Sequence, residues 1–195
     1  MQQLFVIILL LIGCNHNIFA QKKSEQFIQA PESLTQQKVT YNAAYFAIKY
    51  PNGDIPSEYG VCADVVIRAY RKIGIDLQKE VHEDMLKHFH LYPKAWKLQH
   101  TDTNIDHRRV LNLMTFFKRK GIELSTTEIA GDYTPGDIVC WRLPNNLTHI
   151  GIVINKQSTD KHRHLIIHNI GRGQELSDCL FKFKIIGHYR YGISH

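Results

Sequence analysis

The apolar residues in the first half of the chain recur mostly at every third or fourth position, the spacing of an amphipathic helix. After Cys62 this spacing is kept by Val65, Ala69 and Ile73, and Gly74 follows where such a helix would end. The same pattern occurs in three further segments. It predicts helices over Glu32–Ile48, from Cys62 to Ile73, within residues 79–100 and over Leu111–Arg119, the last closed by Gly121.

The second half of the chain changes to short runs rich in β-branched and aromatic residues, separated by polar loops. These runs are Asp137–Leu143, His149–Asn155, Leu165–Ile170 and Lys184–Tyr191. Helices followed by strands predict an α+β fold in which N-terminal helices pack on a small antiparallel sheet. The length of 195 residues suits a single domain, which we place at residues 32–195, preceded by a flexible leader at residues 21–31.

The N-terminus carries an unbroken apolar run, Leu4–Ile12, which is too short to span a bilayer and is typical of a secretory signal. We therefore expect residues 1–20 to be a signal peptide and the protein to be exported, as a periplasmic or a secreted protein. Two processing sites fit. Leu11–Cys14 resembles a lipobox, which would turn Cys14 into a lipidated membrane anchor, whereas Asn17–Ala20 resembles an ordinary signal-peptidase site.

The net charge of +6 favours anionic binding partners, because a basic exported protein is attracted to anionic surfaces such as cell-wall polymers. No run of lysine and arginine alternates with aromatic residues, which argues against nucleic-acid binding. The chain has 12 histidines, and His162, His164 and His168 lie close in sequence, but their spacing is unlike that of a zinc site. We expect neither a metal nor another cofactor.

Three cysteines follow the expected signal peptide: Cys62, Cys140 and Cys179. An odd number leaves at least one free thiol in an oxidising exterior, where a free thiol requires a reason to persist. Two interpretations stay open. Either Cys62 is a reactive thiol, or Cys140 and Cys179 form a disulfide and Cys62 is simply buried.

Cys62 stands at the expected start of a helix, where backbone N–H groups and the helix dipole stabilise a thiolate. His149 opens an expected strand far downstream and is the candidate base for such a nucleophile. A third polar residue would orient the imidazole. His168 and Asn169 are neighbours in an expected strand and point to opposite faces, so only one of them can contact His149.

Several short motifs, taken together, are similar to those of the NlpC-type papain-like peptidases that trim bacterial cell walls. They resemble more closely a bacterial family of unknown function, DUF1287, and the resemblance covers residues 40–191. The motifs are Gly60–Cys62, Val81–Met85, Asn104–Val110, Pro135–Val139, His149–Val153 and His168–Gly171.

The resemblance implies a papain-like fold in which Cys62 is the nucleophile, His149 the base and His168 the orienting residue. It also implies a cysteine peptidase or amidase that cleaves an amide bond in peptidoglycan stem peptides or a related wall substrate. We expect the enzyme to act as a monomer. The alternatives are a catalytically silent wall-binding module of the same fold and, with less support, a metal-dependent hydrolase.

Four residues are candidates for substrate binding: Asp64, Arg108, Arg109 and Asn169. The nucleophile of the better-known peptidases is typically followed by Ser-Gly, whereas Ala63–Asp64 follows here; a helix cap is the alternative role for Asp64. A guanidinium group binds a carboxylate with two hydrogen bonds, so Arg108 or Arg109 could hold a carboxylate of a stem peptide. A solvated, salt-bridged loop is the alternative for these arginines.

Overall fold

The computed structural model describes residues 21–193. The predicted signal peptide, residues 1–20, and Cys14 lie outside the described residues. Within residues 21–193, no helix has the length and the apolar character needed to cross a membrane.

The helical elements precede most of the strands, and they include three short 3-10 helices. The helices are an N-terminal helix at residues 21–34, α2 (Cys62–Lys72), α3 (Leu77–His88), η1 (Phe89–Leu91), η2 (Asp106–Arg108), α4 (Val110–Lys120) and η3 (Ala130–Asp132). The strands are β1 (Thr40–Tyr41), β2 (Tyr59–Gly60), β3 (Ile122–Glu123), β4 (Ile138–Arg142), β5 (Thr148–Gln157), β6 (His164–His168), β7 (Glu175–Ser177) and β8 (Lys184–Arg190). The predicted α+β class is confirmed.

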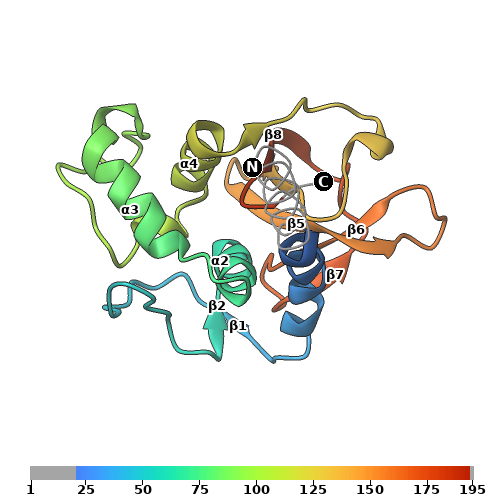
Figure 1. The fold of residues 1–195 in the computed structure, drawn as a ribbon, viewed down its shortest axis with the longest axis horizontal. Helices are drawn as coiled ribbons and strands as arrows, with labels where there is room; N and C mark the ends of the chain where they lie inside the picture. The colour runs from blue at the N-terminus through green and yellow to red at the C-terminus, as the bar shows by residue number, and fades with distance from the viewer. Residues whose placement is uncertain (1–20, 194–195) are drawn as a thin grey trace, which may run out of the picture.

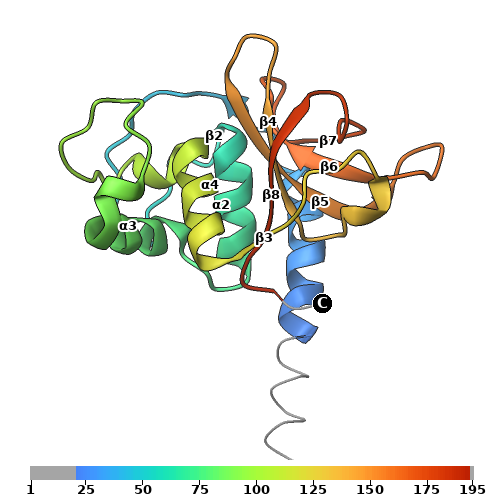
Figure 2. The ribbon, with the colours of Figure 1, turned by 90° about the horizontal axis from the view of Figure 1, so that it is seen from above.

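The main sheet has six strands in the order β3-β8-β4-β5-β6-β7, and every neighbouring pair is antiparallel. The pair β1 and β2 forms a separate two-stranded parallel sheet. Figure 1 shows α2, α3 and α4 on one side of the molecule and the main sheet on the other. In Figure 2, α2 and α4 lie between α3 and the sheet. The strands predicted in the second half are thus confirmed as one antiparallel sheet.

The sheet separates two apolar cores. The larger core joins the helices to one face of the sheet and contains Ile150, Ile152 and Ile167. The smaller core lies on the other face, around Trp141 and Val153. Side chains alternate between the faces of a strand, so β5 contributes its even-numbered isoleucines to the first core and Val153 to the second.

Helix α2 is the central helix, and its residues Cys62–Tyr70 are all buried. Its first turn is closed by Asp64, whose carboxylate accepts the Val61 N–H at 2.7 Å. An acidic residue in the first turn is also favoured by the helix dipole. The helix ends at Lys72 with Ile73 as its C-cap, and Gly74 follows with φ 77° and donates its N–H to the Arg71 carbonyl. A positive φ at the end of a helix favours glycine, as the sequence predicted.

Two predictions for the N-terminal part are wrong. The leader at residues 21–31 is helical instead of flexible, because Phe27 and Leu34, seven positions apart on one helix face, are both buried in the larger core. The helix predicted over Glu32–Ile48 does not continue beyond residue 34. Distant side chains bind the backbone there: Asn104 accepts the Ile48 N–H, and Arg108 donates to the Ala44 carbonyl.

Candidate active site

The candidate nucleophile Cys62 is the first residue of α2 and is 6% exposed. The strand β2 delivers the chain to the N-cap residue Val61. The backbone N–H groups of Ile150 and Ala63 lie near the Cys62 sulfur and favour its thiolate form. Because Ile150 directly follows His149 in β5, the thiol lies beside the start of that strand.

Burial raises the pKa of the Cys62 thiol to about 11; the Ile150 N–H opposes this shift, and the charge of Asp64 adds to it. In the resting site the thiol is therefore protonated at neutral pH. A nucleophile of this kind must lose its proton as it attacks, which makes a base at the same place necessary.

The candidate base His149 lies in β5 and is 2% exposed. Its Nε2 atom is 2.8 Å from Nδ1 of His168 in the neighbouring strand β6. Gly151 permits this approach, because a Cβ atom there would lie 2.7 Å from the Ile166 side chain and 2.8 Å from the Ile167 carbonyl oxygen. With Nε2 engaged by His168, Nδ1 is the nitrogen of His149 left for proton transfer.

Burial, with a smaller contribution from the neighbouring His168, lowers the pKa of His149 to about 3. Burial likewise lowers the pKa of His168 to about 4, with a further contribution from the charge of Lys182. Both imidazoles are therefore neutral at pH 7. A neutral imidazole is the form that can accept a proton.

The partner on the other side of His168 is Ser177 in β7, whose hydroxyl lies 2.6 Å from His168 Nε2. The sequence analysis missed Ser177 because β7 is only three residues long and has no recognisable strand pattern. The Cys179 sulfur lies 3.7 Å from the same nitrogen. The imidazole of His168 is thus held from both sides, by His149 and by Ser177.

The strand alternation expected for His168 and Asn169 is present, and it separates their contacts. Whereas His168 contacts His149, the Asn169 side chain donates to the Gly60 carbonyl at 3.1 Å and accepts the Gly171 N–H at 3.1 Å. Asn169 therefore ties the end of β6 to the segment that precedes Cys62. The contact with His149 belongs to His168.

A cavity of about 420 Å³ opens at this place. Its lining residues are Tyr41, Cys62, Leu143, Pro144, Asn145, Leu147, Thr148, His149, Asn169, Ile170 and Phe183. None of them is Asp, Glu, Lys or Arg, so recognition in this cavity depends on apolar contacts and neutral hydrogen-bonding groups. The cavity is of the size that small ligands occupy in proteins. A larger cavity, beside α3, shares no residue with it.

Asp64 and Arg108 do not reach this cavity, and their placement corrects the expectation that they bind substrate. They form a buried ion pair with two hydrogen bonds, Nε to Oδ1 at 2.9 Å and Nη2 to Oδ2 at 3.1 Å. The third donor of Arg108, Nη1, binds the Ala44 carbonyl. The pair joins α2 to η2, and the capping role that was the alternative for Asp64 is the one observed.

Arg109 is also remote from the cavity. Its guanidinium stacks over the Trp96 ring at 4.5 Å and donates to Asp106 at 3.2 Å. The salt-bridged loop that was the alternative for these arginines therefore describes Arg109. Of the four candidates for substrate binding, only Asn169 lines the cavity.

The other two cysteines within residues 21–193 are free thiols. Cys140 belongs to the larger core and Cys179 to the smaller one, so the sheet lies between them, and neither is bridged. Burial raises the pKa of both thiols. Within residues 21–193, no three side chains of His, Cys, Asp or Glu come together as a group that could hold a metal ion.

The fold and the site define an α+β protein in which a cysteine at a helix start and a strand histidine line one cavity, and a second histidine in the neighbouring strand holds the first. The chain belongs to the family described as "Domain of unknown function (DUF1287)", whose model matches residues 28–191. It is 53% identical over 151 residues to the uncharacterized protein YijF of Escherichia coli strain K12, covering 77% of this chain and 73% of that protein.

A solved structure, NlpC1 from Trichomonas vaginalis, overlaps 86% of this chain with a TM-score of 0.46 and 14% sequence identity. The overlap covers 44% of that chain, which is less than half of its length.

Proposed function

We propose that the protein is an exported cysteine hydrolase that cleaves an amide bond in peptidoglycan stem peptides or a related wall substrate. The observation that carries the proposal is the meeting of Cys62 and His149 at one cavity, with the second nitrogen of His149 held by His168. The wall substrate is supported by the motif resemblance to cell-wall peptidases and by the net charge of +6, which favours anionic polymers.

The reaction begins with a substrate carbonyl in the cavity. His149 Nδ1 takes the Cys62 proton as the sulfur attacks the carbonyl carbon, and the carbonyl π electrons move to the oxygen. The N–H groups of Cys62 and Ala63, at the start of α2, are the proposed donors for this oxyanion. His149 then gives the proton to the leaving amine, the C–N bond breaks, and a thioester remains on Cys62.

A water molecule completes the cycle. His149 accepts one proton of the water as its oxygen attacks the thioester, and then returns that proton to the Cys62 sulfur as the acid leaves. For Nδ1 to accept, Nε2 of His149 donates to His168 Nδ1, and His168 Nε2 then donates to the Ser177 hydroxyl oxygen. One consistent set of tautomers thus serves the whole sequence of steps.

The direct test is digestion of purified peptidoglycan by the wild type, by Cys62→Ala and by the matched control Cys140→Ala, with products identified by mass. We expect new peptide or amine ends from the wild type and from the control, and none from Cys62→Ala. Cleavage that persists in Cys62→Ala, or no product from any of the three, contradicts the proposal.

A catalytically silent wall-binding module is the second candidate, and the raised pKa of the buried Cys62 thiol favours it. The two candidates differ in reactivity. A hydrolase predicts that iodoacetamide labels Cys62 selectively near pH 7 through proton transfer to His149, and that His149→Ala slows this labelling. Equally slow labelling of Cys62, Cys140 and Cys179, with retained peptidoglycan binding, would favour the module.

The metal-dependent alternative has its own signature. It predicts that a chelator abolishes hydrolysis and that Cys62→Ala retains it. The cysteine mechanism predicts the reverse for both measurements.

A further inference from the structure

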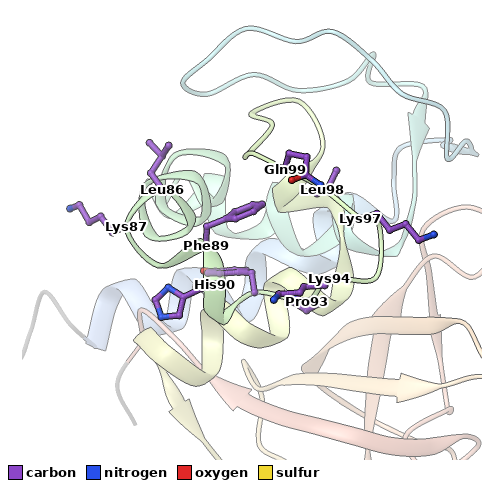
Figure 3. A pocket seen from close by; sticks show the side chains of 10 residues that line it. Leu86, Lys87, Phe89, His90, Pro93, Lys94, Lys97, Leu98 and Gln99 are labelled. Carbon is purple, nitrogen blue, oxygen red and sulfur yellow. The ribbon is translucent and has the colours of Figure 1, made fainter.

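A second cavity, of about 790 Å³, lies beside the end of α3 and is almost twice the size of the Cys62 cavity. Its walls come from α3, η1 and the loop at residues 93–99. Figure 3 shows the Phe89 side chain pointing toward the loop that carries Leu98 and Gln99. A volume of this size holds a ligand of several hundred daltons.

Apolar side chains gather around this cavity without being covered. Phe89, Pro93 and Leu98 line it. Around it, Leu86 is 61% exposed, Leu91 is 49% exposed and Trp96 is 38% exposed. Exposed apolar groups that cluster in this way mark binding surfaces more often than single exposed residues do.

The charged side chains that line the cavity are all positive. Lys87, Lys94 and Lys97 line it, and none of its ten lining residues is Asp or Glu. No carboxylate of residues 21–193 lies within ion-pair distance of any of these three ammonium groups. Figure 3 shows Lys87 and Lys97 extending outward on opposite sides of the cavity. The lining is therefore cationic, whereas the neighbouring Arg109, stacked over Trp96, is already paired with Asp106.

We propose that this cavity binds a single-chain anionic lipid. The acyl chain lies against Phe89 and Leu98, and the acidic head group pairs with the ammonium group of Lys94, while Lys87 and Lys97, on opposite sides of the cavity, add positive charge around it. Both halves of this chemistry are needed: the apolar walls remove the chain from water, and the unpaired lysines match an anionic head. The proposal does not depend on the proposed hydrolase, because the two cavities share no residue.

The probe is dodecyl phosphate, used below its micelle concentration with the full chain. Trp96 lies in the loop at residues 93–99 and is 38% exposed, whereas Trp141, the other tryptophan, is 0% exposed, so tryptophan fluorescence reports on this cavity. We expect saturable binding by calorimetry and a blue shift of the fluorescence. The shift should vanish in Trp96→Phe.

The lysines are tested by a triple variant, Lys87→Gln/Lys94→Gln/Lys97→Gln, in which exposed side chains change and the fold is retained. The affinity for dodecyl phosphate should fall about tenfold. The matched control replaces three exposed lysines elsewhere, Lys38, Lys72 and Lys184, and should bind as the wild type does.

Binding of compounds with other head groups, or with no acyl chain, tests whether both parts of the lipid are recognised. Equal binding of dodecyl maltoside or dodecyltrimethylammonium would overturn the proposal, since charge would then play no part. Equal binding of inorganic phosphate would also overturn it, because the chain would be unnecessary. Binding to anionic vesicles but not to monomeric dodecyl phosphate would instead indicate a membrane-docking surface. Peptidoglycan digestion by the triple variant is expected to be unchanged, which separates this test from that of the hydrolase.

Discussion

Two buried imidazoles in the same sheet, those of His149 and His188, have very different surroundings. His188 in β8 lies 3.0 Å from the Asp137 carboxylate and 3.0 Å from the Ser125 carbonyl oxygen. Both of its nitrogens face oxygen acceptors, so neither is left to accept a proton. His149 is held by the neutral His168 at one nitrogen only, and it lines a cavity together with Cys62.

The difference shows that a strong partner for an imidazole does not by itself indicate a catalytic site. The pair of His188 and Asp137 has the residue types of a His–Asp dyad, yet Asp137 is 0% exposed and also binds Arg190 and the Thr134 N–H. Burial alone would raise the pKa of Asp137, but hydrogen bonds from His188, Thr134 and Arg190 outweigh it and lower the pKa. This network stabilises the fold, whereas the His149 network leaves a nitrogen available for chemistry.

The largest expected effect separates the two histidines by activity. His149→Ala should lower kcat/KM for peptidoglycan fragments about a thousandfold, because it removes the proposed general base. In His188→Gln, the matched control, kcat/KM per folded molecule should stay within about threefold of the wild type. Steady-state kinetics on both purified variants measures the two values. Similar losses of kcat/KM in the two variants would show that the two histidines do not differ in their role in the reaction.

The second effect concerns stability. His188→Ala leaves the buried Asp137 carboxylate without one of its donors, so the free energy of unfolding should fall by about 3 kcal/mol. Urea unfolding of His188→Ala and His149→Ala at pH 7 measures the contrast. We expect the smaller loss in His149→Ala, and the reverse order would contradict the roles assigned to the two rings.

The pH dependence of stability follows from the lowered pKa values of His149 and His168, about 3 and about 4. An unfolded histidine has a pKa of about 6.5, so below that pH the unfolded chain binds more protons than the folded one. The folded protein is therefore most stable, as far as these two histidines are concerned, above pH 6.5, and it loses this stability as the pH falls toward 4. Each buried imidazole should lower the free energy of unfolding by roughly 1 to 2 kcal/mol between pH 7 and pH 5.

Urea unfolding at these two pH values should accordingly show a steep loss for the wild type and a shallower one for His149→Gln. An identical loss in both proteins would mean that His149 does not bind a proton on unfolding.

The smallest effect concerns Ser177. Ser177→Ala leaves His168 Nε2 without its hydroxyl partner, so kcat should fall about fivefold, the value of one neutral hydrogen bond. KM should be unchanged, since Ser177 does not line the cavity. Ser177→Thr restores the hydroxyl and should restore most of kcat. A change in KM alone would assign Ser177 to substrate binding instead of to the positioning of His168.

Much of the fold could be predicted because local patterns determine it. The spacing after Cys62 and the position of Gly74 predicted α2, and the short runs of β-branched and aromatic residues in the second half predicted four strands of the main sheet. The segment before Cys62 could not be predicted in this way. Its apolar periodicity suggested a helix, but contacts from Asn104 and Arg108, more than fifty residues away, hold its backbone in another conformation.

The candidate site, too, could be predicted only in part. Residue type and strand position pointed to Cys62, His149 and His168, and in the structure Cys62 and His149 line one cavity while His168 contacts His149. Long-range pairing explains what could not be predicted. The Asp64 and Arg108 side chains neutralise each other across 44 positions of sequence, and Ser177 reaches His168 from a strand too short to recognise.

The hydrogen bond from Asn169 to the Gly60 carbonyl has a consequence for the newly made chain. It joins positions 109 residues apart, so the segment that carries Cys62 takes its final place only after β6 has been synthesised and paired. Until then Cys62 is an ordinary thiol with no imidazole beside it. The reactivity proposed for this cysteine thus depends on a strand that is synthesised about a hundred residues after it.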